Sequence, residues 1–373
     1  MIVMNLELDN IYGFKDFKIN FSYPKKIVNS IIENEYLEGR PNFRYKKAIV
    51  LLGANATGKT SLGRALLRIF AFLETGDFSS IQQMVANKQK QTKISIDFVN
   101  IGYVLHRLTI VITPESMIGK KIPYSIGMNY ETAKILKQDT YEKAVTKLTH
   151  VDYKQSILAQ LFFSKKIGPI TSYMAIEDSF NKQETSSIDQ QLFLKTLTAV
   201  IGTLDPTLTD ISILEGIEDS YVIRRDGQEI IIQKGRLTNP ELLSSGTVSG
   251  IEIAILLARI ISNNNGFYFC DEHFSFIHTE LEKRIFGIMA ENLQGNEQLI
   301  FTTHNSDMMD LLLPKHSYAF MRKQKEGEVY KISTIFASDI LKRNTDSVRC
   351  AAENDVFSSI PDESKLDSLS NLN

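Results

Sequence analysis

Cysteine is scarce in this sequence, since its 373 residues contain only Cys270 and Cys350. Cys270 lies in an apolar run and Cys350 in a polar tail, so neither a disulfide framework nor a zinc site is predicted. No apolar run is long enough to span a membrane, and the first residues lack the basic and apolar regions of a signal peptide. We therefore expect a cytoplasmic protein that does not contact a membrane.

The formal net charge is also small, at −2. This value argues against a broadly basic nucleic-acid-binding protein but leaves a local basic patch possible. Hydrophobic residues make up 43% and charged residues 23%, which is typical of soluble globular proteins. No internal repeat and no sustained heptad pattern is present, so a long coiled-coil arm is not predicted.

The stretch Gly53–Ser61 reads G-A-N-A-T-G-K-T-S and fits the pattern G-x-x-x-x-G-K-[ST]. An apolar run, Ala48–Leu52, precedes it, and apolar residues at helical spacing follow it from Leu62 to Leu73. A strand, a glycine-rich turn and a helix direct backbone N–H groups and the helix dipole at one point, where a lysine adds a full positive charge. The alternative is a chance glycine-rich turn before a core helix. The residues predicted to bind the phosphates of a nucleoside triphosphate are Gly53, Asn55, Ala56, Thr57, Gly58, Lys59, Thr60 and Ser61, with the Thr60 hydroxyl on Mg²⁺.

Several short apolar patterns predict β-strands around this unit. Residues 2–22 alternate apolar and polar side chains on both sides of Gly13, and residues 94–113 have the pattern of a hairpin. Asp226-Gly227 between two β-rich runs predicts a two-residue hairpin turn. The basic residues of 24–47 are interpreted as a solvated, irregular connection, which we favour over an anion-facing or nucleic-acid-facing patch.

The character of the chain changes after residue 113. Helices are predicted near 131–149, 153–163 and 187–204, and the last has Ser187 and Gln190 at the spacing of a capping box. The predicted organisation is an N-terminal lobe at 1–113, a helical insertion at 114–205, a C-terminal lobe at 206–340 and a polar tail at 341–373.

A second group of polar residues begins at Leu243–Thr247, L-S-S-G-T, directly before an apolar helix predicted at 248–262. A buried strand at 267–270 then ends in Asp271 and Glu272. In a parallel sheet this edge lies beside the glycine-rich turn, where Asp271 can reach Mg²⁺ and Glu272 can orient or deprotonate the attacking water. The alternative is an ordinary acidic turn after a core strand.

A further apolar strand, Leu299–Thr303, ends at His304 and follows the Asp-Glu strand after one predicted helix, about 280–293. This order is typical of a neighbouring parallel strand. The imidazole of His304 can then hydrogen-bond the γ-phosphate, although a single histidine at a strand end is more often structural. The predicted catalytic residues are Lys59, Glu272 and His304, and the predicted metal ligands are Thr60 and Asp271.

Taken together, G-A-N-A-T-G-K-T, L-S-S-G-T, F-Y-F-C-D-E and T-T-H-N resemble the Walker A, signature, Walker B and His-switch motifs of ABC-type ATPases. The resemblance is closest to the SMC/RecF/OLD-like branch, which includes "AAA family ATPase" proteins of bacterial phage defence such as OLD-like, Septu-like and abortive-infection systems. It implies an α/β fold: a P-loop ABC-type ATPase head with a mixed sheet, an antiparallel β subdomain and a helical insertion. It also implies ATP and Mg²⁺ as cofactors and a head-to-tail dimer, in which Ser244, Ser245 and Gly246 seal the partner's nucleotide. Gln155 and Gln160 are candidates for the Q-loop.

The expected function is an ATP-hydrolysing switch that controls a separate effector, such as a nuclease or toxin, in anti-phage defence. About 70 residues follow His304, which is too few for the Toprim nuclease domain of OLD-like proteins. A transporter ATPase subunit is disfavoured by the wide gap between Gly53 and Leu243. An SMC/RecF-like DNA-repair or DNA-clamping ATPase and a non-hydrolysing assembly scaffold remain as alternatives.

Overall fold

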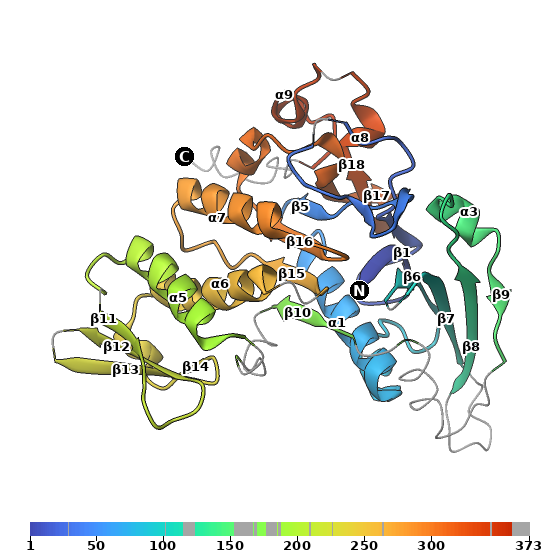
Figure 1. Ribbon diagram of the computed structural model, residues 1–373. Helices are drawn as coiled ribbons and strands as arrows, with labels where there is room; N and C mark the ends of the chain where they lie inside the picture. Colours follow the sequence, from blue (N-terminus) through green and yellow to red (C-terminus); the bar gives the residue numbers. More distant parts are fainter. Residues whose placement is uncertain are drawn as a thin grey trace, which may run out of the picture.

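A computed structural model describes residues 1–28, 30–100, 102–114, 124–152, 167, 170–176, 185, 188–208, 210–225, 227–262, 265–343 and 345–359. Two six-stranded sheets lie with helix α1 (Lys59–Thr75) between them, and a smaller β-containing lobe lies at one end of the molecule (Figure 1). Within the described ranges, no helix combines the length and the apolarity needed to cross a lipid bilayer.

The first sheet is antiparallel throughout, in the order β2-β1-β6-β7-β8-β9. Its apolar face packs toward α1, because alternate strand residues such as Leu6, Leu8, Ile94 and Ile96 are buried in the same cluster as that helix. Both the strand pair around Gly13 and the 94–113 hairpin are confirmed. The strands are β1 (Ile2–Asp9), β2 (Phe17–Asn20), β6 (Thr92–Val99), β7 (Val104–Pro114), β8 (Tyr124–Lys134) and β9 (Thr149–His150).

The second sheet is central and has the order β10-β15-β16-β5-β17-β18. Its strands run parallel, except that β18 is antiparallel to β17. Strands β5 and β16 are buried along their whole lengths, as expected for parallel strands covered on both faces. The strands are β10 (Ser172–Ala175), β15 (Phe267–Asp271), β16 (Gln298–Thr303), β5 (Ala48–Leu52), β17 (Tyr318–Glu326) and β18 (Val329–Phe336).

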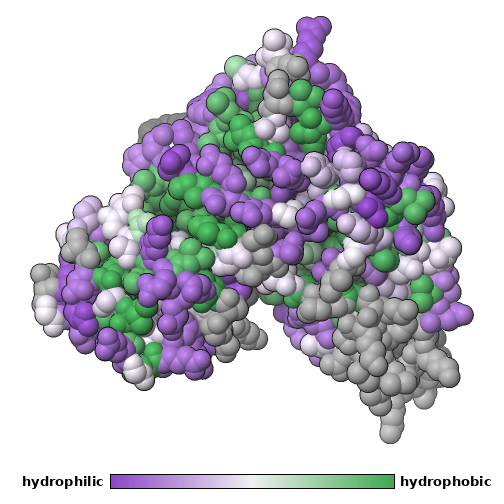
Figure 2. Space-filling view, viewed as in Figure 1, coloured by the Kyte–Doolittle hydropathy of each residue, from purple (hydrophilic) through white to green (hydrophobic). Residues whose placement is uncertain are grey.

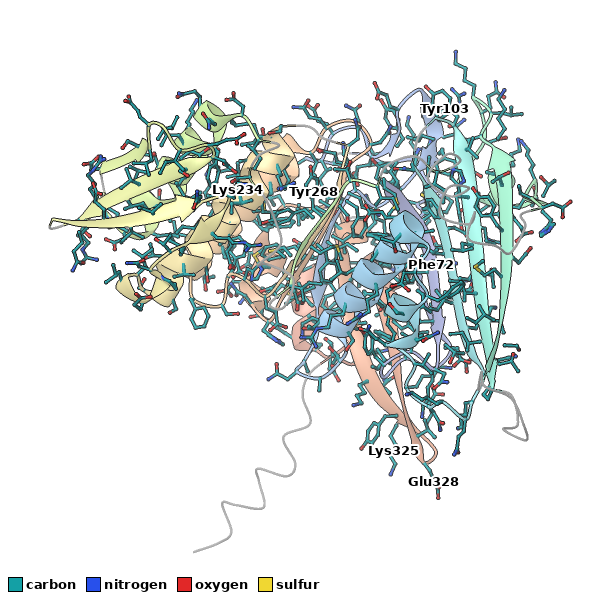
Figure 3. The ribbon with its side chains drawn as sticks, turned by 90° about the horizontal axis from the view of Figure 1, so that it is seen from below. Phe72, Tyr103, Lys234, Tyr268, Lys325 and Glu328 are labelled. Atoms are coloured by element: carbon teal, nitrogen blue, oxygen red, sulfur yellow. The ribbon has the colours of Figure 1, made fainter. Side chains whose placement is uncertain are left out.

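Helices cover both faces of the central sheet. Ile49 and Leu51 of β5 pack in the cluster that contains α1, whereas Val50 and Leu52 pack with α6 (Ser245–Ile261) and α7 (Thr279–Asn292). Figure 3 shows Phe72 of α1 in the layer between the two sheets. The short α2 (Ser79–Gln82) follows α1, whose C-terminus is capped by Gly76 at φ 70°.

The smaller lobe combines helix α5 (Gln190–Leu204) with a four-stranded antiparallel sheet. Its apolar side chains join those of α6 in one core cluster, so the lobe is packed on the helix and is not a separate body. Figure 2 shows apolar residues on this face over the small sheet and around α6 and α7. The predicted hairpin is confirmed, with Gly227 at φ 78°. The remaining elements are β11 (Asp210–Ile213), β12 (Ser220–Arg225), β13 (Gln228–Gln233), β14 (Arg236–Leu237) and the 3₁₀ turn η2 (Pro240–Leu242).

The C-terminal part completes the central sheet, because β17 pairs with β5 and β18 forms the edge. The β17–β18 hairpin projects from the body, with Lys325 and Glu328 at its tip (Figure 3). Phe357 is fully buried and stacks on Phe320 of β17 with ring centroids 3.9 Å apart. The short elements here are η3 (Ser306–Asp310), η4 (Lys315–Ser317), α8 (Ala337–Ile340) and α9 (Val348–Glu353), which carries the exposed Cys350.

The helix predicted at 131–149 is wrong. Residues up to 134 belong to β8, which pairs with β7 along its 11 residues, and only α3 (Tyr141–Val145) is helical in that range. Long-range pairing with β7 therefore overrides the local helical preference. The helix at 187–204 is confirmed from residue 190, but its cap is Asp189, whose Oδ1 accepts from Leu192 N at 2.8 Å. Ser187 and the helix predicted at 153–163 lie outside the described residues.

The interpretation of 24–47 as a solvated, irregular connection needs correction. It contains a small hairpin of β3 (Tyr36–Leu37) and β4 (Arg40–Arg44). Lys46 and Lys47 are buried and donate to backbone carbonyls, Lys46 Nζ to Asn20 O at 2.7 Å and Lys47 Nζ to Leu293 O at 3.0 Å. Burial lowers the pKa of Lys46 to about 8. These two ammonium groups therefore join parts of the fold and are not available to an external anion.

Gly63 allows α1 to approach the central sheet closely, and this contact can be tested. A Cβ atom at position 63 would lie 2.5 Å from the ring of Phe269 and 2.9 Å from Ile176, both of which are buried. Gly63→Ala should therefore destabilise the protein by about 1–3 kcal/mol in urea unfolding. The matched control is Gly202→Ala on α5, which should be neutral or slightly stabilising. Among the described residues, an added Cβ atom there has no neighbour within 4 Å beyond its own stretch of helix. Equal effects of the two substitutions would contradict this account.

Candidate functional site

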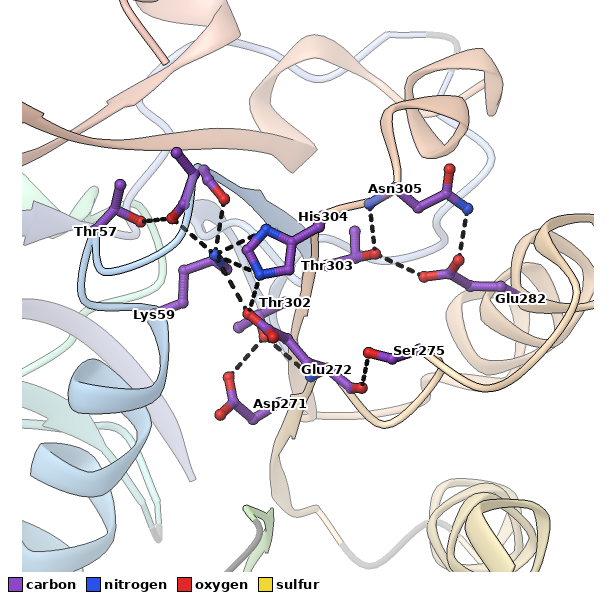
Figure 4. A network of polar contacts seen from close by, with 12 residues as sticks. Thr57, Lys59, Asp271, Glu272, Ser275, Glu282, Thr302, Thr303, His304 and Asn305 are labelled. Atoms are coloured by element: carbon purple, nitrogen blue, oxygen red, sulfur yellow. Dashed lines mark hydrogen bonds and ion pairs between the residues drawn. The ribbon is translucent and has the colours of Figure 1, made fainter. Parts of the chain in front are cut away.

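The predicted site residues meet at the carboxyl ends of three neighbouring parallel strands. β5 leads into Gly53–Ser61, β16 into His304, and β15 into Asp271 and Glu272. β16 lies between β5 and β15, so the histidine stands between the glycine-rich loop and the two carboxylates (Figure 4). Such an edge of an open α/β sheet is where ligands bind.

The loop between β5 and α1 has a constrained backbone. Gly58 is at φ 104° as it enters the helix, and Ala56 is at φ 60°, a left-handed conformation that few residues other than glycine adopt. A Cβ atom on Gly53 would lie 2.5 Å from the carbonyl oxygen of Met321. Thr57 Oγ1 donates to Ala54 O at 2.8 Å and closes the loop on itself.

Lys59 is the cation at the centre of the site. Its side chain is only 3% exposed, and Nζ donates to Gly53 O at 2.7 Å and to Ala54 O at 3.3 Å. It also forms an ion pair with Glu272 Oε1 at 3.3 Å. Burial lowers the pKa of Lys59, and the negative charge of Glu272 partly offsets this effect. The ammonium is therefore fixed inside the loop, where a phosphate could take the place of its present partners.

Glu272 and His304 complete this group. His304 Nε2 lies 2.8 Å from Glu272 Oε1, and both ring nitrogens lie within 3.5 Å of Lys59 Nζ (Figure 4). The backbone of Glu272 is held at φ 53°, in the left-handed region. For a residue other than glycine this conformation destabilises the fold by about 1–3 kcal/mol, and such strain is often found at functional sites. The carboxylate thus bridges the lysine and the histidine.

Asp271 lies beside this bridge. Its Oδ1 accepts a hydrogen bond from Thr302 Oγ1 at 2.7 Å. Burial raises the pKa of Asp271, and hydrogen bonds from Thr60 and Thr302 oppose that rise. A hydroxyl and a carboxylate are the hard oxygen ligands that Mg²⁺ prefers. Thr60 and Asp271 therefore fit a magnesium ion.

The segment Leu243–Thr247 forms the start of α6. Ser244 is the N-cap, and its Oγ accepts from Thr247 N at 3.1 Å. Ser245 lines a cavity of about 640 Å³ that is also lined by Thr60, Asp271 and Glu272. A Cβ atom on Gly246 would lie 3.2 Å from Phe276 O, so this segment lies beside the loop that follows Glu272.

A second cavity, of about 650 Å³, lies beside the glycine-rich loop. It is lined by Gly53, Asn55 and His304, together with Phe320 and Ala352. The exposed side chain of Asn55 and that of His304 therefore face a space that the C-terminal segment helps to enclose.

Sequence reasoning missed two acidic residues at the site. Glu252 of α6 lines the 640 Å³ cavity, with Oε2 3.7 Å from His273 Nδ1, and burial raises its pKa to about 7. Glu282 of α7 is buried and accepts hydrogen bonds from Thr303 and Asn305. No local pattern marks either residue, because each reaches the site from the side of a helix. Gln155 and Gln160 lie outside the described residues.

Comparison with known proteins identifies the architecture. No protein-family model matches the chain, and no curated protein matches its sequence. The structure of the SmcHead bound to the C-winged helix domain of ScpA matches with a TM-score of 0.54 and 14% identity, over 91% of this chain and 100% of that chain. An Smc head domain with an extended coiled coil, bound to the C-terminal domain of ScpA and derived from Pyrococcus furiosus, matches with a TM-score of 0.53 and 13% identity, over 91% and 97%.

These likenesses define the class of fold. The chain has the fold of an SMC head, with a mixed central sheet and a separate antiparallel sheet. At this level of identity the likeness concerns the fold, and the chemistry must be argued from the site.

Glu252 provides a test of the electrostatics of the cavity. Because its pKa is raised from 4.5 to about 7, its contribution to stability is complete below pH 4.5 and is lost as the pH rises through 7. Glu252→Gln should therefore be more stable than the wild type at pH 8, by up to about 3 kcal/mol, and nearly equal to it at pH 5. Urea unfolding at both pH values measures this, with the exposed Glu291→Gln as control. A difference that does not change with pH would contradict the assignment.

Proposed function

We propose that this chain binds ATP with Mg²⁺ and hydrolyses the γ-phosphate as an ABC-type ATPase. The observation that carries the proposal is that Lys59, Glu272 and His304 lie within 3.5 Å of one another at one edge of the central sheet. Asp271, the chain neighbour of Glu272, is held at the same edge by Thr302. A buried lysine inside a glycine-rich loop at a helix N-terminus suits a polyphosphate. The SMC-head fold supports the same interpretation.

In this proposal each side chain has one role. Lys59 and the backbone N–H groups of the loop hold the phosphates, and Thr60 and Asp271 hold Mg²⁺, which neutralises phosphate charge when bound. Glu272 orients the attacking water or accepts its proton. His304 donates a hydrogen bond to the γ-phosphate.

We further propose that two copies associate head to tail, so that Ser244, Ser245 and Gly246 of one copy seal the nucleotide of the other. Ser244 caps α6, and the N–H groups and dipole of that helix end suit a phosphate. Phe276, beside this segment, exposes 69% of its surface, and an exposed aromatic side chain of this kind is suited to an interface.

The biological role that we propose is a nucleotide-driven switch that controls a separate effector, such as a nuclease, in bacterial anti-phage defence. The order and form of the four motifs support it through their resemblance to ATPases of such systems. A second candidate is an ATPase that clamps or repairs DNA, which the resemblance of the same motifs to the SMC/RecF branch implies. An ATP-dependent assembly scaffold that does not hydrolyse is the third.

Two substitutions test the chemistry. Lys59→Ala removes the central cation and should abolish measurable ATP binding.

Glu272→Gln should keep ATP affinity but lower kcat about 100-fold or more, because it removes the proposed base. It should also accumulate as a dimer at saturating ATP, which light scattering would detect. Glu291→Gln, an exposed glutamate on α7, is the control and should behave as wild type. Retained affinity in the first variant or unchanged turnover in the second would refute the assignment of the site.

Purification from the native host tests the biological role. We expect the chain to co-purify with a second protein of nuclease or toxin type, identified by mass spectrometry, and to change that protein's activity when ATP is added. Isolation of this chain alone would contradict the effector proposal. ATPase activity that double-stranded DNA stimulates severalfold, without such a partner, would favour the DNA-clamping candidate.

A further inference from the structure

Helix α7 carries a carboxylate that reaches the loop around His304. Glu282 exposes only 4% of its surface, and its two oxygens accept hydrogen bonds from different donors. Oε1 accepts from Thr303 Oγ1 at 2.8 Å, and Oε2 accepts from Asn305 Nδ2 at 2.6 Å (Figure 4). Thr303 and Asn305 are the two chain neighbours of His304, so one side chain holds both flanks of the histidine.

The contacts around Glu282 form a connected network. Thr303 Oγ1 also accepts from the backbone N–H of Asn305 at 3.0 Å, and Asn305 Oδ1 accepts from Asp307 N at 3.0 Å. The loop therefore has few alternative conformations that keep its polar groups paired, and unpaired buried polar groups are costly. The imidazole is in turn held 2.8 Å from the carboxylate of Glu272.

An apolar side chain would be the ordinary choice at this position. The other buried residues of α7 are Ile285, Phe286, Met289 and Ala290. A buried carboxylate is expensive to desolvate, and burial raises the pKa of Glu282 against the opposing effect of its two hydrogen bonds. Helix α7 also begins directly after the turn that follows Glu272. The helix that carries Glu282 is therefore linked to Glu272 through the chain and to the His304 loop through hydrogen bonds.

We propose that Glu282 is a positioning residue that fixes where the His304 imidazole lies relative to Glu272 and Lys59. It does not touch the reacting atoms, and it acts by holding the backbone on both sides of the histidine. The proposal rests on the proposed ATPase function for its kinetic consequence, but the geometric claim is independent of it.

A reciprocal pair of substitutions tests the proposal. Glu282→Gln has only one acceptor oxygen for two donors, and Asn305→Asp places two carboxylates face to face. Each should lower kcat about tenfold or more and change the KM for ATP by less than about twofold, because the imidazole is misplaced. In the double variant Glu282→Gln/Asn305→Asp, the introduced amide donates to the introduced carboxylate, and the amide oxygen accepts from Thr303. That variant should recover kcat to within about threefold of the wild type.

The NMR signals of the His304 ring report its position directly. A lower free energy of unfolding alone would not shift these signals in the folded protein. The ring signals, assigned by comparison with His304→Ala, should shift in both single variants and return in the double variant. Glu291→Gln on the exposed side of α7 should leave kcat and these signals unchanged. Wild-type kcat and unshifted His304 signals in Glu282→Gln would overturn the proposal, as would losses of activity that only follow the folded fraction. If the wild-type protein does not hydrolyse ATP, the proposed function fails, and the ring signals alone decide the positioning role.

Discussion

The site depends on the ion pair between the buried ammonium group of Lys59 and the carboxylate of Glu272. Lys59 is almost fully enclosed, and a charge in that position must be paired and hydrogen-bonded to be tolerated. Two loop carbonyls and Glu272 satisfy it in this structure, and Glu272 also contacts His304. An anion bound at Lys59 would compete with Glu272 for the same charge. In the proposed function, occupation of the loop and release of the carboxylate would therefore be coupled.

The arrangement follows from strand order more than from any single contact. Parallel strands deliver their carboxyl ends to one edge, and the order β15-β16-β5 brings segments separated by more than two hundred positions to the same point. Most side chains of these strands are apolar, and they are covered by α1 on one side of the sheet and by α6 and α7 on the other. The polar groups at the edge can take strained or costly conformations, such as φ 53° at Glu272, because the buried sheet behind them fixes the backbone.

How much of this could be predicted from the sequence depends on whether the determining signal is local. The run Ala48–Leu52, the glycine-rich loop and the Asp226-Gly227 turn carry their information within a few residues, and the structure has the predicted elements there. Residues 131–134 are strand through pairing with β7, and two of them also pair with β9. No local pattern reveals these partners, so a helix is wrongly predicted there. Lys46 and Lys47 are misassigned for a similar reason, since charged side chains predict exposure unless distant carbonyls are there to receive them.

The residues that the motifs identify are not placed independently of one another. Helix α7 follows the turn that contains Glu272, packs against α6, and reaches the His304 loop through Glu282. The start of α6 in turn carries Ser244 and Ser245. A displacement of α7 would therefore act on the turn after Glu272, the loop around His304 and helix α6 together, because packed helices move as units and not atom by atom. The motifs specify which groups are present, and strand order brings them to one edge of the sheet. The packing around α7 adds contacts from residues that carry no motif, such as Glu282.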